Sequence, residues 1–442
     1  MNRLMITCMA MWVALGLFAV PAAPAMAQDS VVVQESNSTE SVFDLSDFFD
    51  QFAPPEFNGF IDARMGGRTR TDPEEKQVSM AEVRLQGEAF TYTDWADFKY
   101  KGDIRADGVN DKIVYETREL WAFSRPTDYM DVKVGRQILT WGTGGLVFLN
   151  DLFPKDWRSF FMGRDAEYLK APCNSAKVSF FTELTNIDMV YSPKFEPDNY
   201  IDGEYISYWS NTEGGIVGRD NILDTDIPGD WFSDDEISAR IYRNINNYEL
   251  ALYGYWGYWK TPLGMNSDDE ATFPGLNVYG ASIRGQLGPG IGNAEIAWYD
   301  SFESEGGTNS EVANSQIRYL VGYAQELWTD SNCEVQYYVE QMLDYANYLD
   351  FHDPEYPKDE FRHVITLQLS QQFCNQNLTL SFDSYYSPSD NDAYLRPGMK
   401  YKISDRTTIG FGANLFMGAE EQTFFGQFCN NSNVYSSLRY SF

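Results

Sequence analysis

Basic side chains at alternate positions are the residues of this chain best suited to bind a solute. In several β-like runs arginine and lysine recur at alternate positions, which places their side chains on one face of the run. Such a row binds carboxylates and phosphates, and arginine does so through two parallel hydrogen bonds. The members of this predicted row are Arg64, Arg84, Lys99, Lys101, Arg105, Arg118, Lys133 and Arg136. Strict alternation from Lys133 sends Arg136 to the opposite face, so we expect a bulge near Gly135 to return it.

Catalytic chemistry has little support in the sequence. The only histidines are His352 and His363, and neither has a serine or cysteine partner at a recognisable spacing. The chain has no Cys-x-x-Cys pair, zinc-ligand spacing, calcium loop or phosphate-binding loop. A net charge of −32 disfavours nucleic acid. We therefore expect no enzyme, no cofactor, no metal site and no nucleic-acid partner.

An aromatic segment over 142–173 is too apolar for a solvated loop, and its glycines and Pro154 prevent one continuous helix. It follows an alternating run that begins at Asp131. We expect it to fold over or into the mouth of a barrel, either as a constriction or as a platform for sugars. The side chains assigned to that role are Phe148, Phe153, Trp157, Phe160 and Phe161. Packing of these rings against the inner wall is an equal alternative.

The elements that must carry these residues are β-strands. From residue 57 onward apolar and polar residues alternate in runs of about ten, which is the length of a tilted membrane-crossing strand. Short turns alternate with long loops between the runs, as in outer-membrane barrels. We predict an all-β fold, a transmembrane antiparallel β-barrel of about 18 strands over 57–442.

The N-terminus has the pattern of a secretory signal peptide. Arg3 precedes an apolar run, and Ala25-Met26-Ala27 forms a cleavage site, so residues 1–27 are expected to be removed. Residues 28–56 are expected to be a periplasmic segment with a short helix over 38–52. With the barrel pattern, this export signal predicts the outer membrane of a Gram-negative cell, with membrane lipid and lipopolysaccharide as partners. The terminal Phe442 resembles the signal that barrel-assembly machinery recognises.

The four cysteines that follow the signal peptide suggest disulfides. Cys333 opens one predicted strand and Cys374 closes its neighbour, both at the short-turn end, so we predict that they are bridged. Cys173 and Cys429 both fall on the long-loop side, where a second bridge is possible.

The predicted inner face carries more bases than acids, so the excess acids must concentrate in the loops. A basic lumen attracts anions and filters solutes by sign. We expect a porin or export channel for anionic solutes. Arginine and glutamate that brace the wall across strands are the competing interpretation. A closed structural or adhesion barrel, or a sleeve for a partner subunit, acting through its outer loops, is the alternative function.

The stretch GRQILTWG resembles the alginate-export and related porin-like barrel families, through Gly135, Arg136, Gln137 and Gly142. In those families a G-R-Q-x-x-x-x-G stretch lies on a strand that precedes a long loop. The resemblance implies an arginine-lined channel that passes an anionic polysaccharide or small anions.

Overall fold

The computed structural model describes residues 51–352 and 354–442. The predicted signal peptide and nearly all of the predicted N-terminal helix lie outside this part of the chain. Within the described part, no helix has the length and apolar character needed to cross a membrane.

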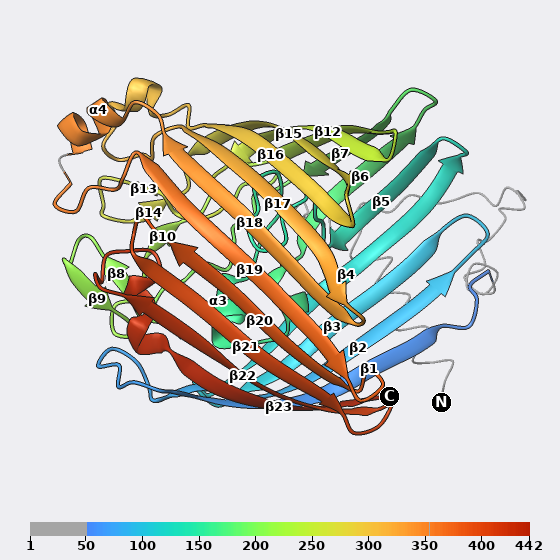
Figure 1. Cartoon of the computed structure of the whole chain (residues 1–442). Helices are drawn as coiled ribbons and strands as arrows, with labels where there is room; N and C mark the ends of the chain where they lie inside the picture. Colours follow the sequence, from blue (N-terminus) through green and yellow to red (C-terminus); the bar gives the residue numbers. More distant parts are fainter. Residues whose placement is uncertain (1–50, 353) are drawn as a thin grey trace, which may run out of the picture.

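Eighteen antiparallel strands form one closed barrel, which confirms the predicted fold class (Figure 1). Each strand pairs with the next, and the last pairs with the first, so that Phe60 lies opposite Ser441. Closure leaves the sheet without an edge. The barrel strands are β1 (Glu56–Arg68), β2 (Val78–Tyr92), β3 (Asp97–Asp107), β4 (Lys112–Thr127), β5 (Met130–Gln137), β6 (Cys173–Phe181), β7 (Asn186–Ser192), β11 (Glu236–Ile245), β12 (Tyr248–Tyr258), β15 (Gly275–Leu287), β16 (Gly290–Asp300), β17 (Gln316–Trp328), β18 (Ser331–Met342), β19 (Phe361–Phe373), β20 (Leu378–Ser387), β21 (Asp392–Lys402), β22 (Thr407–Gly418) and β23 (Asn433–Ser441).

Alternation along each strand separates an apolar outer face from a polar inner face. On β1, Ile61 and Met65 are exposed, whereas Asp62 and Arg64 between them are buried. The register keeps this order across strands, because Arg64 lies opposite Glu82 on β2. The period-two pattern of the sequence therefore directs charged side chains into the barrel.

Connections at the two ends of the barrel differ in length. At the short-turn end, Asn246 and Asn247 adopt positive φ and join two strands directly. At the other end, which we call the long-loop end, the alternation of short and long connections predicts long loops at about 106–113 and 387–393. These two predictions are wrong, because 108–111 and 388–391 are turns of four residues. The first turn is tight because the Asp107 carboxylate accepts hydrogen bonds from the backbone of Val109 and Asn110.

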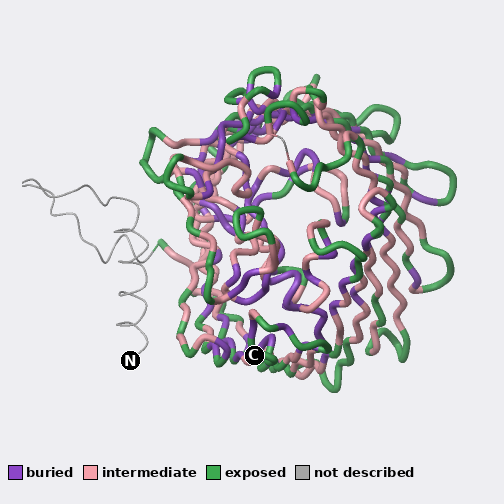
Figure 2. The backbone as a smooth tube through the Cα atoms, turned by 90° about the vertical axis from the view of Figure 1, so that its left-hand side faces the viewer, coloured by how far each residue is buried: buried purple, intermediate pink, exposed green. Residues whose placement is uncertain are grey.

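Two long connections, 138–172 and 193–235, supply chain to the inside of the barrel. Figure 2 shows buried segments within the ring of strands. Leu149, Phe161 and Ile206 belong to one apolar cluster with inward side chains of the wall, from Met80 on β2 to Phe416 on β22. The barrel interior thus has a core of its own.

Short elements lie in the connections. They are α3 (Trp157–Met162), η1 (Ala166–Leu169), β8 (Tyr208–Ser210), β9 (Gly215–Val217), β10 (Thr225–Asp226), β13 (Gly264–Met265), β14 (Ala271–Thr272), η2 (Glu305–Gly307), α4 (Tyr345–Asn347), η3 (Tyr348–His352) and η4 (Gly426–Asn431).

Candidate functional site

The short helix α3 sets the direction of the inserted connection. Asp156 caps its start by accepting a hydrogen bond from the backbone N–H of Ser159 at 2.7 Å. Gly163 ends it at φ +93°, and a Cβ there would lie 2.2 Å from the ring of Tyr435. Only glycine fits this position. The following residues, 163–170, face the inner wall of β1–β4, and we call them the arch.

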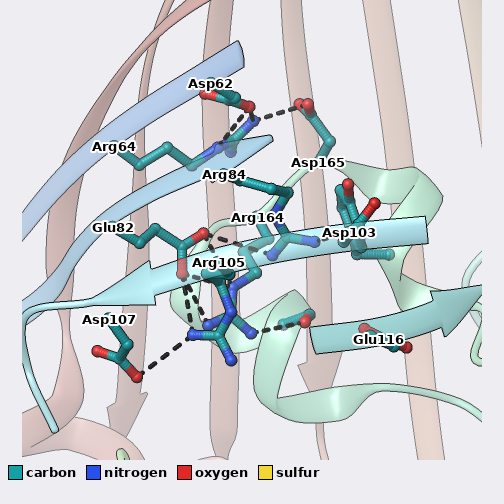
Figure 3. Close-up of polar contacts among 12 residues, drawn as sticks. Asp62, Arg64, Glu82, Arg84, Asp103, Arg105, Asp107, Glu116, Arg164 and Asp165 are labelled. Atoms are coloured by element: carbon teal, nitrogen blue, oxygen red, sulfur yellow. Dashed lines mark hydrogen bonds and ion pairs between the residues drawn. The ribbon is translucent and has the colours of Figure 1, made fainter. Parts of the chain in front are cut away.

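The arch is fixed to β2 by a buried carboxylate. Glu82 accepts from Arg164 of the arch at 2.9 Å and also pairs with Arg105 at 3.3 Å (Figure 3). Arg84, on the same face of β2, pairs with Asp103 at 2.6 Å. Arg64 comes from β1 and Arg105 from β3, the two strands that flank β2, so strand register brings these predicted lumen residues together. Their charges are neutralised by acids of the wall.

A second carboxylate of the arch sits among cations of the closing strands. Asp165 pairs with Arg64 at 2.7 Å, with Lys400 at 2.7 Å, and with Arg439. Burial alone would raise the pKa of Asp165, but these three cations hold it below its ordinary value. The exposed Glu167 follows, 3.4 Å from Lys101. The arch therefore places negative charge in direct contact with cations of the wall.

Tyr168 fills the space between two of the predicted arginines. The guanidinium carbons of Arg84 and Arg118 lie 3.9 Å and 4.6 Å from its ring centroid. Arg118 is 1% exposed and donates to the backbone carbonyls of Glu167 and Lys170. Arg118 thus holds the arch rather than facing an aqueous path.

Lys99 and Lys133 lie nearer the short-turn end. Lys99 pairs with Glu88 and Glu119, both at 3.3 Å. The Lys133 ammonium lies 4.1 Å from the Trp121 ring centroid, and no carboxylate among the described residues pairs with it.

Arg136 does not join the row, and the expected bulge near Gly135 is absent. The register runs unbroken through Gly135, which lies opposite Trp121 and Ser175. Arg136 therefore stays on the outward face of β5. At the rim its guanidinium binds Glu196 at 2.8 Å and the Thr117 carbonyl. Gly135 is needed for another reason. Its φ is +126°, and a Cβ would lie 2.2 Å from a backbone oxygen of β4.

The aromatic side chains of the loop pack into the internal core. Phe160 and Phe161 are 2% and 4% exposed and pack edge-on against Tyr394 of the inner wall. Phe153 packs against Trp141. The partly buried Phe148 lies beside Trp157, whose indole N–H donates to Asp198. These contacts correspond to the packing alternative, and Phe153, Phe160 and Phe161 leave little ring surface for a sugar.

Glu295 of β16 anchors the start of the same loop from across the barrel. Its carboxylate accepts from the backbone N–H groups of Thr143 and Gly144 and from the side chain of Asn150. The alternation predicted that Glu295 faces inward but gave it no role, and sequence reasoning missed the arch residues Arg164, Asp165, Glu167 and Tyr168. No periodicity could have found the arch, because it lies in a connection.

The predicted disulfide between Cys333 and Cys374 is wrong, because both thiols are free. Cys333 lies opposite Leu369, five residues before Cys374. At about 3.4 Å per residue the two Cα atoms are far beyond the ~7 Å that a disulfide allows. Cys173 and Cys429 are free as well, so the possible second bridge is not formed.

Two further cations face the interior near the short-turn end. Arg284 lies opposite Asn293, which points inward to Thr143, and Lys402 lies opposite Thr408. Both are exposed, and neither has an ion pair within the described ranges. With Lys133 they form a set of unpaired inward cations. In the same part of the chain, no group of histidine, cysteine, aspartate or glutamate side chains is arranged to hold a metal ion.

The comparisons with known proteins support the fold. No protein-family model and no curated protein sequence matches the chain. Among solved structures, the chain is similar to OccD3 (OpdP) of Pseudomonas aeruginosa, with a TM-score of 0.51 and 9% identity over 88% of this chain and 90% of that one. A mutant porin of Rhodopseudomonas blastica aligns with a TM-score of 0.40 and 11% identity over 88% of this chain and 100% of that one. At these identities the likeness to OccD3 shows that this chain has the barrel fold of a porin.

Proposed function

We propose that the protein is an outer-membrane channel through which small anionic solutes diffuse, without catalysis. The observation that carries this proposal is the set of unpaired inward cations, Lys133, Arg284 and Lys402, near the short-turn end of the barrel. Glu249 lies opposite Arg284 on the neighbouring strand, but it forms no ion pair with it. Inside a low-dielectric wall, positive charge that no ion pair holds lowers the cost of admitting an anion and raises that of a cation. The porin-like fold and the apolar outer face support the membrane location, and the exposed Phe442 supports delivery there by barrel-assembly machinery.

The route for the solute in this proposal runs past the arch. Glu167 is exposed and pairs with Lys101 at 3.4 Å, so solute passing here meets exposed charges of both signs side by side. Most of the predicted arginine row is occupied by carboxylates of the wall and the arch, so we assign it to bracing and to shaping this field. The unpaired cations nearer the short-turn end then set the preference for anions.

Acidic oligosaccharide is our finer proposal for the solute. Its support is the resemblance of Gly135, Arg136, Gln137 and Gly142 to the alginate-export families. In this chain Gly135 and Gln137 act at the entry to the inserted loop, where Gln137 is fully buried and donates to the Ser175 carbonyl. A short uronic-acid oligomer should block the current at concentrations where a neutral oligomer of equal length does not.

A closed barrel is the second candidate, because the internal core joins the inserted connections to the wall from β2 to β22. Planar-bilayer recording in a salt gradient separates the two. We expect open channels with an anion-selective reversal potential. Replacing the three unpaired cations by glutamine should reduce that selectivity.

The control variant replaces Arg243 and Arg406, which are exposed at the short-turn end and have no ion pair among the described residues, and should change selectivity much less. No conductance from folded protein would favour the closed barrel. Cation selectivity would mean that the acidic loops control permeation, which contradicts the proposal.

A further inference from the structure

The outer face of the barrel carries an apolar groove over β1, β21, β22 and β23. It is open to the surroundings rather than an enclosed pocket. Its walls include Met65, Phe411 and Val434, which are 70%, 50% and 52% exposed and point away from the interior. The groove therefore faces the membrane in the proposed location.

Small side chains between large ones hollow the wall at this place. Ser436 lies between Met65 and Phe411 on adjacent strands. One step nearer the long-loop end, Gly67 and Ala413 flank Val434. Strands are about 4.8 Å apart, so the short side chains leave a depression between their larger neighbours.

The strand ladder is also interrupted beside the groove. Pairing of β21 with β22 passes from Leu395 opposite Leu415 directly to Gly398 opposite Gly412, and skips two residues on each strand, Pro397 among them. Proline has no backbone N–H to donate to the ladder. The interruption lies on the groove wall, where Pro397 is one of the lining residues.

Two cations lie next to the long-loop end of the groove. Gly67 and Val78 line that end, and the connection 69–77 between them carries the exposed Arg70 and Lys76. Neither has an ion pair within the described residues, although the chain as a whole has a net charge of −32. The Lys76 ammonium donates one hydrogen bond to the Val109 carbonyl, which leaves two of its donors for a ligand. Arginine and lysine at this end of the barrel wall complement a phosphate group at a membrane surface.

We propose that this groove binds the acyl chain of a membrane lipid whose phosphate group contacts Arg70 and Lys76. A second copy of the chain is a poorer occupant, because a two-fold contact between copies of equal orientation would bring the same cations together. The proposal rests on the membrane location given above and not on conduction.

Native mass spectrometry of the purified full-length protein tests the proposal, with bisphosphorylated lipid A and uncharged diacylglycerol as probes. We expect the wild-type protein to retain lipid A. Ala413→Phe and Ser436→Phe fill the groove and should weaken retention at least tenfold. Ala239→Phe places the same ring on the outward face of β11 and should retain lipid A normally. Arg70→Gln with Lys76→Gln should abolish the preference for lipid A over diacylglycerol.

Heat-modifiable migration in gels reports whether each variant is folded. If the phenylalanine variants do not fold, Gly67→Leu serves instead, because a Cβ there meets no other atom within 3.7 Å. Equal lipid A retention by the folded groove-filling variants would overturn the proposal. A variant that retains lipid A but changes its oligomeric mass would assign the groove to a second copy. Conductance of the same samples should stay unchanged, which separates failure of this proposal from failure of the channel.

Discussion

Glu82→Gln should release the arch, because Glu82 is the only carboxylate that pairs with Arg164 among the described residues. Arg164 is 5% exposed, and its remaining side-chain contact is a hydrogen bond to the Ser159 hydroxyl at 2.9 Å. Arg84 and Arg105 keep Asp103 and Asp107 as partners. The substitution therefore leaves one buried guanidinium without a counter-charge.

Breaking a buried pair in this way costs about 3–5 kcal/mol, which is a factor of about 100 to several thousand in the folding equilibrium. The matched control is Glu88→Gln on the same strand. Glu88 has a 30% exposed side chain, and its partner Lys99 retains Glu119, so the control should cost about 0–1 kcal/mol.

Urea unfolding from lipid vesicles, followed by tryptophan fluorescence, measures both free energies of unfolding. Because the arch can leave the wall without global unfolding, trypsin cleavage after Arg164 and Lys170 should be followed in parallel. The double variant Glu82→Gln, Arg164→Met removes both charges and should recover much of the loss. The reasoning is refuted if Glu82→Gln matches Glu88→Gln in both unfolding free energy and cleavage rate.

Three further predictions address the arch charge, the pH dependence of stability and the thiols. Asp165→Asn removes the acid that Lys400 pairs with, so the reversal potential should move toward greater anion selectivity; an unchanged potential would remove the arch from the permeation path. Burial raises the pKa of Asp198 to about 6, so the folded state binds the proton more tightly than the unfolded state. Stability should then fall as pH rises from about 4 to 6, by up to about 3 kcal/mol, and Asp198→Asn should flatten this slope in unfolding titrations. In alkylation followed by mass mapping without reductant, the exposed Cys374 should react at once and the buried Cys173 only after unfolding; an unreactive Cys374 would contradict its assignment as an exposed free thiol.

The alternating pattern by itself determined the barrel. Each run has an apolar face and a polar face, as in β1 with Ile61 and Met65 on one side and Asp62 and Arg64 on the other. A sheet with these two faces keeps its polar side chains away from membrane lipid only by closing around the polar face. The strand count follows from the same pattern together with the turn residues. The long loop predicted at about 106–113 failed because the Asp107 carboxylate closes a four-residue turn, which composition does not reveal.

Only the tertiary structure decided what the inward charges do. Arg64 and Arg84 look alike in sequence to the unpaired Arg284, yet they are neutralised by Asp165 of the arch and by Asp103 of the next strand. Those partners are set by the path of a connection and by strand register, two long-range properties that no local pattern encodes. Arg136 likewise lies on the opposite face of its strand from the row, because the register passes Gly135 without a bulge. The sequence thus determined which residues face inward, and folding determined which of them remain free to meet a solute.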